Sequence, residues 1–249
     1  MAEPLRLYGM KALVTRAAGG IGGAVARTLV KHGAEVLAVD DPKSGVEQQF
    51  AAVRGIHGLA TAFDDPDGIP ALVEEAAGKL GALDILVNEF SLTPLTPIAE
   101  NGSELDELLR LRAELIMAMC RSALPYLKKS PAGRIINMGF LRSAFAADAH
   151  AASQKAERNL AAVSRALAVE TGGFGITANY VQPGGIMTPE SRAVFRRDKA
   201  LRDHCIASSA AKRLGEPVDV AKVVLFLASG DAVFVSGTGV AVDGGRVDD

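Results

Sequence analysis

Apolar residues in this chain fall into short continuous runs that alternate with longer segments of helical period. The runs do not alternate with polar residues, and this is typical of strands in a parallel sheet that is covered on both faces. Seven runs are predicted to be strands, and they span residues 11–15, 35–40, 58–64, 83–88, 133–138, 176–181 and 240–243.

The intervening segments predict helices at residues 20–31, 66–80, 104–128, 153–171 and 218–228. Alternation of strands and helices favours right-handed crossovers and a doubly wound sheet. We therefore expect an α/β, Rossmann-type parallel sheet of about seven strands, folded as one domain over residues 1–249. Ligands of such sheets lie beyond the carboxyl ends of the strands, near the switch in strand order.

Composition narrows the class of protein. The 249 residues, 49% of them hydrophobic, suit a single α/β domain. A net charge of −2 gives no basic surface for nucleic acid. The two cysteines are too few for a disulfide framework, and neither a signal-peptide core nor a run long enough to span a membrane is present. The sequence thus predicts a cytoplasmic protein with no membrane or nucleic-acid partner.

A glycine-rich turn follows the first predicted strand, in the stretch TRAAGGIGGAVA. Gly20 and Ile21 open the next helix, where backbone N–H groups favour a phosphate. The second strand ends in Asp40, which is placed to accept from a ribose 2′-hydroxyl and to repel a 2′-phosphate. Together these features predict a dinucleotide fold, with NAD more favoured than NADP if either is bound.

Several longer motifs extend along the chain, among them LDILVN, GRIIN, SRALAVE, NYVQPGGIMTP and KRLGEPVDVAKVVLFLAS. With these motifs the chain resembles the short-chain dehydrogenase/reductase family over nearly its full length. The resemblance implies an NAD(P)-dependent oxidoreductase that acts on a small alcohol or carbonyl compound. It also implies a homodimer or homotetramer, with a hetero-oligomer beside an active paralogue as the alternative.

The resemblance implies further cofactor contacts. Asp64 would face the adenine amino group, and Ile186 and Thr188 would hold the nicotinamide carboxamide. Asn88 opens the segment that corresponds to the family motif N-N-A-G.

The chain departs from the family at this cofactor wall. Arg16 replaces the first glycine of the family turn T-G-x-x-x-G-x-G. After Asn88 the chain reads Glu89, Phe90 and Ser91, so Phe90 and Ser91 add bulk beside the expected cofactor ribose. These three replacements, Arg16, Phe90 and Ser91, leave open whether a nicotinamide cofactor binds.

The family's catalytic Asn-Ser-Tyr-Lys positions can be located by counting from two motifs. Twelve residues before Arg165 lies Ser153 in the Tyr position, and thirteen before that lies Phe140 in the Ser position. The Lys position holds Glu157, and counting back from Arg121 places Arg112 in the Asn position. All four usual residues are thus replaced.

These replacements remove the family's proton relay. An unassisted serine hydroxyl is a far poorer acid than a phenol of pKa about 10. A carboxylate at 157 would raise the pKa of a neighbouring acid, whereas the family's ammonium lowers it. Because Arg112 and Glu157 carry opposite charges, we expect them to form an ion pair, and Arg16 and Glu89 to form a similar one. The alternative is that Arg112 and Glu157 each extend into solvent.

Other groups could carry chemistry. His150 lies three residues before the Tyr position, and histidine is the usual acid or base near neutral pH. The candidate catalytic residues are therefore His150 and Ser153, and no metal-ligand spacing is present. Three functions stay open: a family member with unconventional redox or non-redox chemistry, a retired enzyme that serves as a binding or scaffold subunit, and a dehydrogenase that uses His150.

Overall fold

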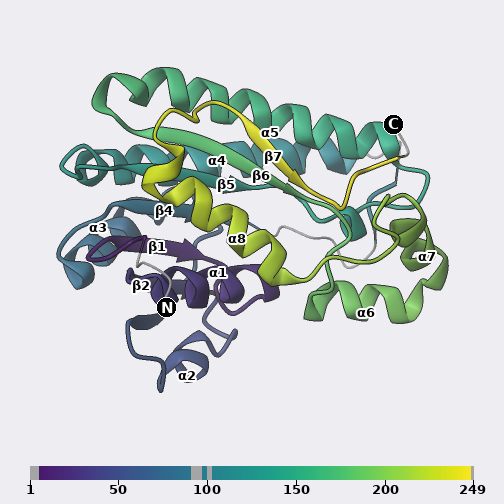
Figure 1. The fold of residues 1–249 in the computed structure, drawn as a ribbon, viewed down its shortest axis with the longest axis horizontal. Coiled ribbons are helices and arrows are strands. Elements are labelled where there is room, and N and C mark those ends of the chain that lie inside the picture. Colours follow the sequence, from purple (N-terminus) through teal and green to yellow (C-terminus); the bar gives the residue numbers. More distant parts are fainter. Residues whose placement is uncertain (1–5, 91–96, 100–102, 248–249) are drawn as a thin grey trace.

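The computed structural model describes residues 6–90, 97–99 and 103–247, and its centre is a seven-stranded parallel sheet with the order β3-β2-β1-β4-β5-β6-β7. Figure 1 shows the sheet with helices on both sides. The strands are β1 (Lys11–Thr15), β2 (Glu35–Asp40), β3 (Ile56–Ala60), β4 (Ile85–Asn88), β5 (Arg134–Met138), β6 (Thr177–Pro183) and β7 (Gly239–Val242). The strand order reverses between β1 and β4, so the doubly wound Rossmann-type fold is confirmed.

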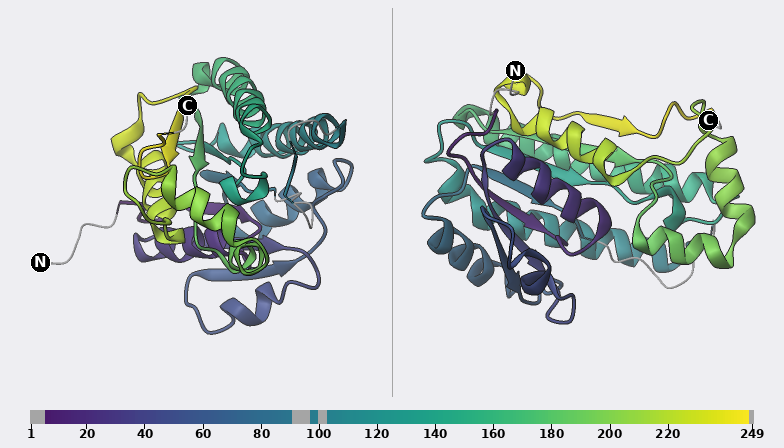
Figure 2. Two further views of the ribbon diagram at one scale, coloured as in Figure 1. Left: turned by 90° about the vertical axis from the view of Figure 1, so that its right-hand side faces the viewer. Right: turned by 60° about the horizontal axis from the view of Figure 1, so that its bottom comes forward.

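The helices form two layers, which Figure 2 shows from two further directions. One hydrophobic cluster joins α1 and α8 to the sheet, and a second joins α3, α4 and α5 to its other face. The helices are α1 (Gly20–Lys31), α2 (Val46–Phe50), α3 (Ile69–Leu80), α4 (Ser103–Leu127), α5 (His150–Thr171), α6 (Pro189–Arg197), α7 (Lys199–Ala207) and α8 (Pro217–Ala228). Three short 3₁₀ turns lie at Arg142–Ala144, Gly172–Phe174 and Gly230–Ala232.

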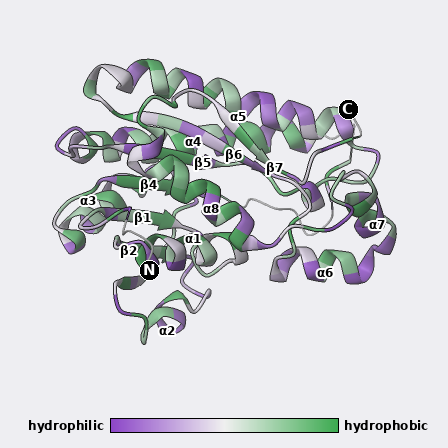
Figure 3. Ribbon diagram, in the orientation of Figure 1, coloured by the Kyte–Doolittle hydropathy of each residue, from purple (hydrophilic) through white to green (hydrophobic). Residues whose placement is uncertain are grey.

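The hydropathy colouring of Figure 3 follows this layering, since the strands at the centre are mainly hydrophobic and α6 and α7 carry many polar residues. No helix in the described part of the chain is long and apolar enough to cross a membrane.

The predicted elements match the structure with local corrections. β3 begins and ends earlier than expected, because Ile56 pairs with Val36 and the strand ends at Ala60 opposite Asp40. α5 begins at His150, three residues before the predicted start. The segment after β6 forms two helices, separated at Asp198, whose carboxylate accepts from the Leu201 N–H at 2.8 Å and so caps α7.

Candidate ligand-binding site

The turn between β1 and α1 keeps the tight geometry of a glycine-rich loop although Arg16 replaces its first glycine. Arg16 adopts a left-handed backbone conformation, with φ of 53°. A Cβ on Gly22 would lie 2.3 Å from the Arg16 carbonyl oxygen, so only glycine fits there. A Cβ on Gly20 would lie 2.8 Å from the Cβ of Thr188, so the loop after β6 packs directly on this turn.

Asp40, the predicted ribose ligand, is buried and holds the glycine turn. One carboxylate oxygen accepts from the Ala18 N–H at 2.8 Å and the other accepts from the Asp41 N–H at 2.7 Å. A buried carboxylate that accepts from backbone N–H groups stabilises a turn. Its contact with a ribose hydroxyl stays a prediction.

The carboxyl end of β4 departs most from what the resemblance implies. The side chain of Asn88 is fully buried and donates to Asn137 Oδ1 at 2.9 Å, so it joins two neighbouring strands. Phe90 is buried and packs against Phe63, with ring centroids 5.8 Å apart. Ser91 lies outside the described residues.

Glu89 occupies the position between these two residues. Its backbone N–H donates to Thr15 Oγ1 at 2.8 Å, which joins β4 to β1. Its Oε2 atom is buried and has no hydrogen-bond partner within residues 6–90, 97–99 and 103–247. Burial raises the pKa of this carboxyl group to about 8, against the opposing effect of the Arg16 and Arg112 charges. The predicted Arg16–Glu89 ion pair is wrong, because no salt bridge joins these two side chains within the described structure.

Arg112 and Phe140, from the Asn and Ser positions, contact one another. The guanidinium of Arg112 lies over the Phe140 ring, 4.0 Å from its centroid, and donates to the Met138 carbonyl oxygen. Both residues are buried, and burial lowers the pKa of Arg112 to about 10. A cavity of only about 20 Å³ remains between these groups, Ile21, Glu89 and Phe90.

Ser153 and Glu157, from the Tyr and Lys positions, face a different space. Both line a pocket of about 400 Å³, which Arg112 and Phe140 do not line. The expected ion pair between Arg112 and Glu157 is therefore wrong. Arg112 is committed to Phe140 and to the end of β5, and no salt bridge between it and Glu157 exists among the described residues. The fold divides the four catalytic positions into two separate pairs.

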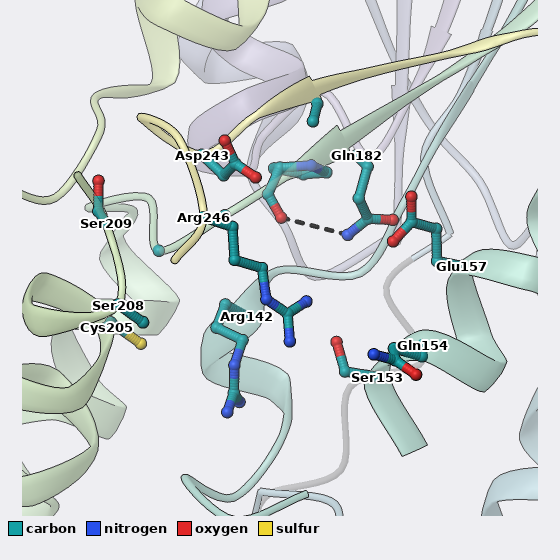
Figure 4. Close-up of a pocket in the computed structure, with 14 residues that line it drawn as sticks. Arg142, Ser153, Gln154, Glu157, Gln182, Cys205, Ser208, Ser209, Asp243 and Arg246 are labelled. Carbon is teal, nitrogen blue, oxygen red and sulfur yellow. Dashed lines mark hydrogen bonds between the residues drawn. The ribbon is translucent and has the colours of Figure 1, made fainter. Parts of the chain in front are cut away.

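The larger pocket lies between α5, the end of β6, α7 and the segment after β7. In Figure 4 the side chains of Arg246, Ser153, Gln182 and Glu157 point into it. Sequence reasoning missed Arg142, Gln182, Asp243 and Arg246, all of which line the pocket. Gln182 could have been predicted, since it lies near the carboxyl end of β6, where ligands of such sheets bind. Arg246 reaches the pocket only because residues 244–247 pair with residues 208–211.

The other predicted site residues are dispersed. His150 begins α5, and its Nδ1 atom lies 3.5 Å from Nη2 of Arg246. Its ring packs edge-on against the ring of His204, and it does not line the pocket. Thr188 caps α6 by accepting from the Ser191 N–H at 3.1 Å, and Ile186 is buried in the core. Asp64 is exposed beyond β3. Among the described residues, no group of three or more potential ligands could hold a metal ion.

Comparison with known proteins agrees with this architecture. A family model described as enoyl-(acyl carrier protein) reductase matches residues 17–246. The chain belongs to the short-chain dehydrogenase/reductase family. It is 31% identical over 245 residues to D-threitol dehydrogenase of Mycolicibacterium smegmatis, covering 96% of this chain and 94% of the relative. It is 30% identical over 244 residues to the 3-oxoacyl-[acyl-carrier-protein] reductases FabG of Vibrio harveyi and Escherichia coli, covering 97% of this chain and 98% of each relative.

Membership makes the chain a relative of NAD(P)-dependent oxidoreductases. Nothing in these relatives supports the preference for NAD over NADP that Asp40 predicted.

The side chains present do not fit a nicotinamide and its ribose between Arg112, Phe140 and the residues after β4. Glu89 and Phe90 fill the wall after β4, and the cavity left beside Arg112 holds about one water molecule.

Proposed function

We propose that this chain is a short-chain dehydrogenase/reductase-family protein that does not transfer hydride by the family's relay and that functions by binding a small molecule. The pocket of about 400 Å³ beside Ser153 and Glu157 would be its binding site. The observation that carries the proposal is the contact of Arg112 with Phe140, because it places two side chains where the relay needs an open space.

The chemistry of the remaining two positions supports the same conclusion. A general acid must lie within reach of the reacting oxygen and have a pKa near the working pH. The hydroxyl of Ser153 is a poor acid, and Glu157, one helical turn later, brings a negative charge in place of a positive one. Neither residue shares a cavity with Arg112 or Phe140.

Turnover assays test this proposal. The purified full-length chain is incubated with NAD, NADH, NADP or NADPH and a panel of alcohols and ketones, and absorbance of the reduced nicotinamide is followed. We expect no substrate-dependent change above the rate without protein. A substrate-dependent rate in the range usual for enzymes, on the order of 1–10³ per second, would overturn the proposal.

We also propose that the chain assembles into an oligomer through the edge of its sheet. β7 is one of the two edge strands, and in the segment that leads to it Val233 is 62% exposed and Phe234 fully exposed. Exposed apolar residues beside a free sheet edge favour pairing with another subunit. Light scattering should report a dimer or tetramer for the wild type and a monomer for Phe234→Asp. An unchanged mass in that variant would exclude this surface.

A further inference from the structure

The pocket beside Ser153 and Glu157 has a balanced set of charges. Two guanidinium groups, from Arg142 and Arg246, and two carboxylates, from Glu157 and Asp243, are among its lining side chains. An anionic ligand would face the two carboxylates, and a cationic ligand would face the two guanidinium groups, so either would bring an uncompensated charge into the pocket. The balance therefore favours a ligand that is neutral overall.

Part of this lining is already committed within the protein. Arg142 donates to the carbonyl oxygens of Phe145, Ala146 and Ala147 at 2.9–3.2 Å and so holds the loop after β5. Asp243 accepts from the Gly245 N–H at 2.9 Å. Arg142 is thus held in place by three carbonyl oxygens, and one carboxylate oxygen of Asp243 is held by a backbone N–H group.

The α5 side of the pocket is different. The carboxylate of Glu157 and the hydroxyl of Ser153 have no hydrogen-bond or ion-pair partner within the part of the chain that the structure describes. Both lie on one face of α5, four residues apart, and both are partly buried. Partly buried polar groups that face a pocket are satisfied by water or by a ligand. This side thus offers a strong acceptor and a hydroxyl that can donate and accept.

Few apolar side chains line the pocket. The lining side chains without polar groups come from Pro183 and Ala241 and from glycines, and no aromatic or branched aliphatic residue contributes. The methylene groups of a bound acyl chain gain most free energy when they leave water for apolar surface. The pocket therefore offers little to an acyl chain and much to a ligand that makes many hydrogen bonds.

We propose that this pocket binds a small neutral polyhydroxylated compound, an open-chain polyol or a monosaccharide. Glu157 would accept from two hydroxyl groups, Ser153 would donate to or accept from a third, and Arg246 would donate to a hydroxyl oxygen on the opposite side. The volume of about 400 Å³ suits a ligand of this size. This inference rests on the proposed function, in which this pocket is the binding site.

Calorimetry on the full-length chain tests the inference. The probes are erythritol, xylitol, myo-inositol and D-xylose, with L-serine as a zwitterion, succinate as an anion and octanoate as an acyl chain. We expect at least one polyhydroxylated probe to bind, and at least tenfold weaker binding of that probe to Glu157→Gln. Glu170→Gln carries the same change on an exposed part of the same helix and should bind as the wild type does. Ser153→Ala is a second variant should Glu157→Gln fail to fold.

Three results would overturn the inference. The first is binding of serine, succinate or octanoate while no polyhydroxylated probe binds, and the second is that no probe binds. The third is a polyol affinity in Glu157→Gln equal to that of the wild type, measured in Ser153→Ala instead should Glu157→Gln not fold. Reduced nicotinamide is followed in parallel samples that contain NAD or NADP. Polyol-dependent reduction would overturn the proposed function while leaving the class of ligand in place. Failure of the polyols to bind, without any redox activity, would overturn this inference alone.

Discussion

The guanidinium of Arg112 covers the ring of Phe140, 4.0 Å from its centroid, and donates to the Met138 carbonyl oxygen at the end of β5. Arg112 comes from α4 and Phe140 from the loop after β5, so the contact joins two elements that frame the family's catalytic centre. A desolvated cation over an aromatic face contributes about 2 kcal/mol. Two replaced catalytic positions thus stabilise each other.

Glu89 gives the protein a stability that depends on pH. The folded-state pKa is about 8, above the ordinary value of 4.5, so the folded state holds its proton where the unfolded chain releases it. The resulting stability is complete below pH about 4.5 and is lost as pH rises to about 8. Each unit of difference in pKa corresponds to about 1.4 kcal/mol, so the loss is on the order of a few kcal/mol.

Glu89→Gln should remove that dependence. In urea unfolding at pH 5, 6, 7 and 8, the free energy of unfolding of the variant should rise relative to that of the wild type as pH increases. Arg112 remains charged throughout this range, since its pKa is about 10. Glu35→Gln is the control, because hydrogen bonds from Lys11 and His57 lower the pKa of Glu35 from its ordinary value of 4.5, so its loss should lower the free energy of unfolding by a similar amount at every pH from 5 to 8. Parallel curves for wild type and Glu89→Gln would contradict the burial of an uncompensated carboxyl group.

Arg16 strains the backbone of the glycine turn. A non-glycine residue at φ of 53° costs about 1 kcal/mol, so Arg16→Gly should raise the free energy of unfolding by about that amount at pH 5.5. Lys212, at φ of 52°, is the matched control, and Lys212→Gly should behave similarly there.

The two variants should separate at pH 8.5, where Glu89 is largely ionised. The Arg16 charge lowers the pKa of Glu89, so it stabilises the ionised carboxylate. Loss of this charge in Arg16→Gly should therefore cancel part of the increase in the free energy of unfolding, whereas Lys212→Gly should keep its full increase. Guanidinium chloride obscures charge effects, so unfolding is measured in urea. Identical behaviour of both variants at the two pH values would show that Arg16 does not act on Glu89.

Phe90 is a core residue in this chain. It is 2% exposed and packs against Phe63, so Phe90→Ala should lower the free energy of unfolding by about 3–5 kcal/mol. Tyr8→Ala, at an aromatic side chain that is 81% exposed, should change it by less than about 0.5 kcal/mol. A loss below about 1 kcal/mol in Phe90→Ala would mean that the ring does not fill the wall after β4.

The strand pattern predicted the fold well because buried parallel strands are continuous apolar runs. β1, β2 and α1 have the predicted bounds. α2 was missed because five residues are too few to show helical period. The start of α5 was misplaced because Ala149, its N-cap, makes no side-chain capping bond and so leaves no sequence signal.

Counting between motifs placed the four catalytic positions along the chain but could not say which cavity each side chain enters. Arg112 and Glu157 look complementary in sequence, yet α4 carries one toward the end of β5 and α5 carries the other toward the end of β6. Arg246 could not be predicted as a pocket residue, because it reaches the pocket through a long-range pairing of the C-terminal segment with Ser209.

A titration with the four nicotinamide nucleotides tests the central claim most directly. NAD, NADH, NADP and NADPH are each titrated into the full-length chain by calorimetry. Because Glu89, Phe90, Arg112 and Phe140 leave only about 20 Å³ beside the Asn and Ser positions, we predict no saturable binding up to about 1 mM, the upper end of the usual range for enzyme substrates. Micromolar binding of any of the four would contradict the account, whether NAD or NADP binds more tightly.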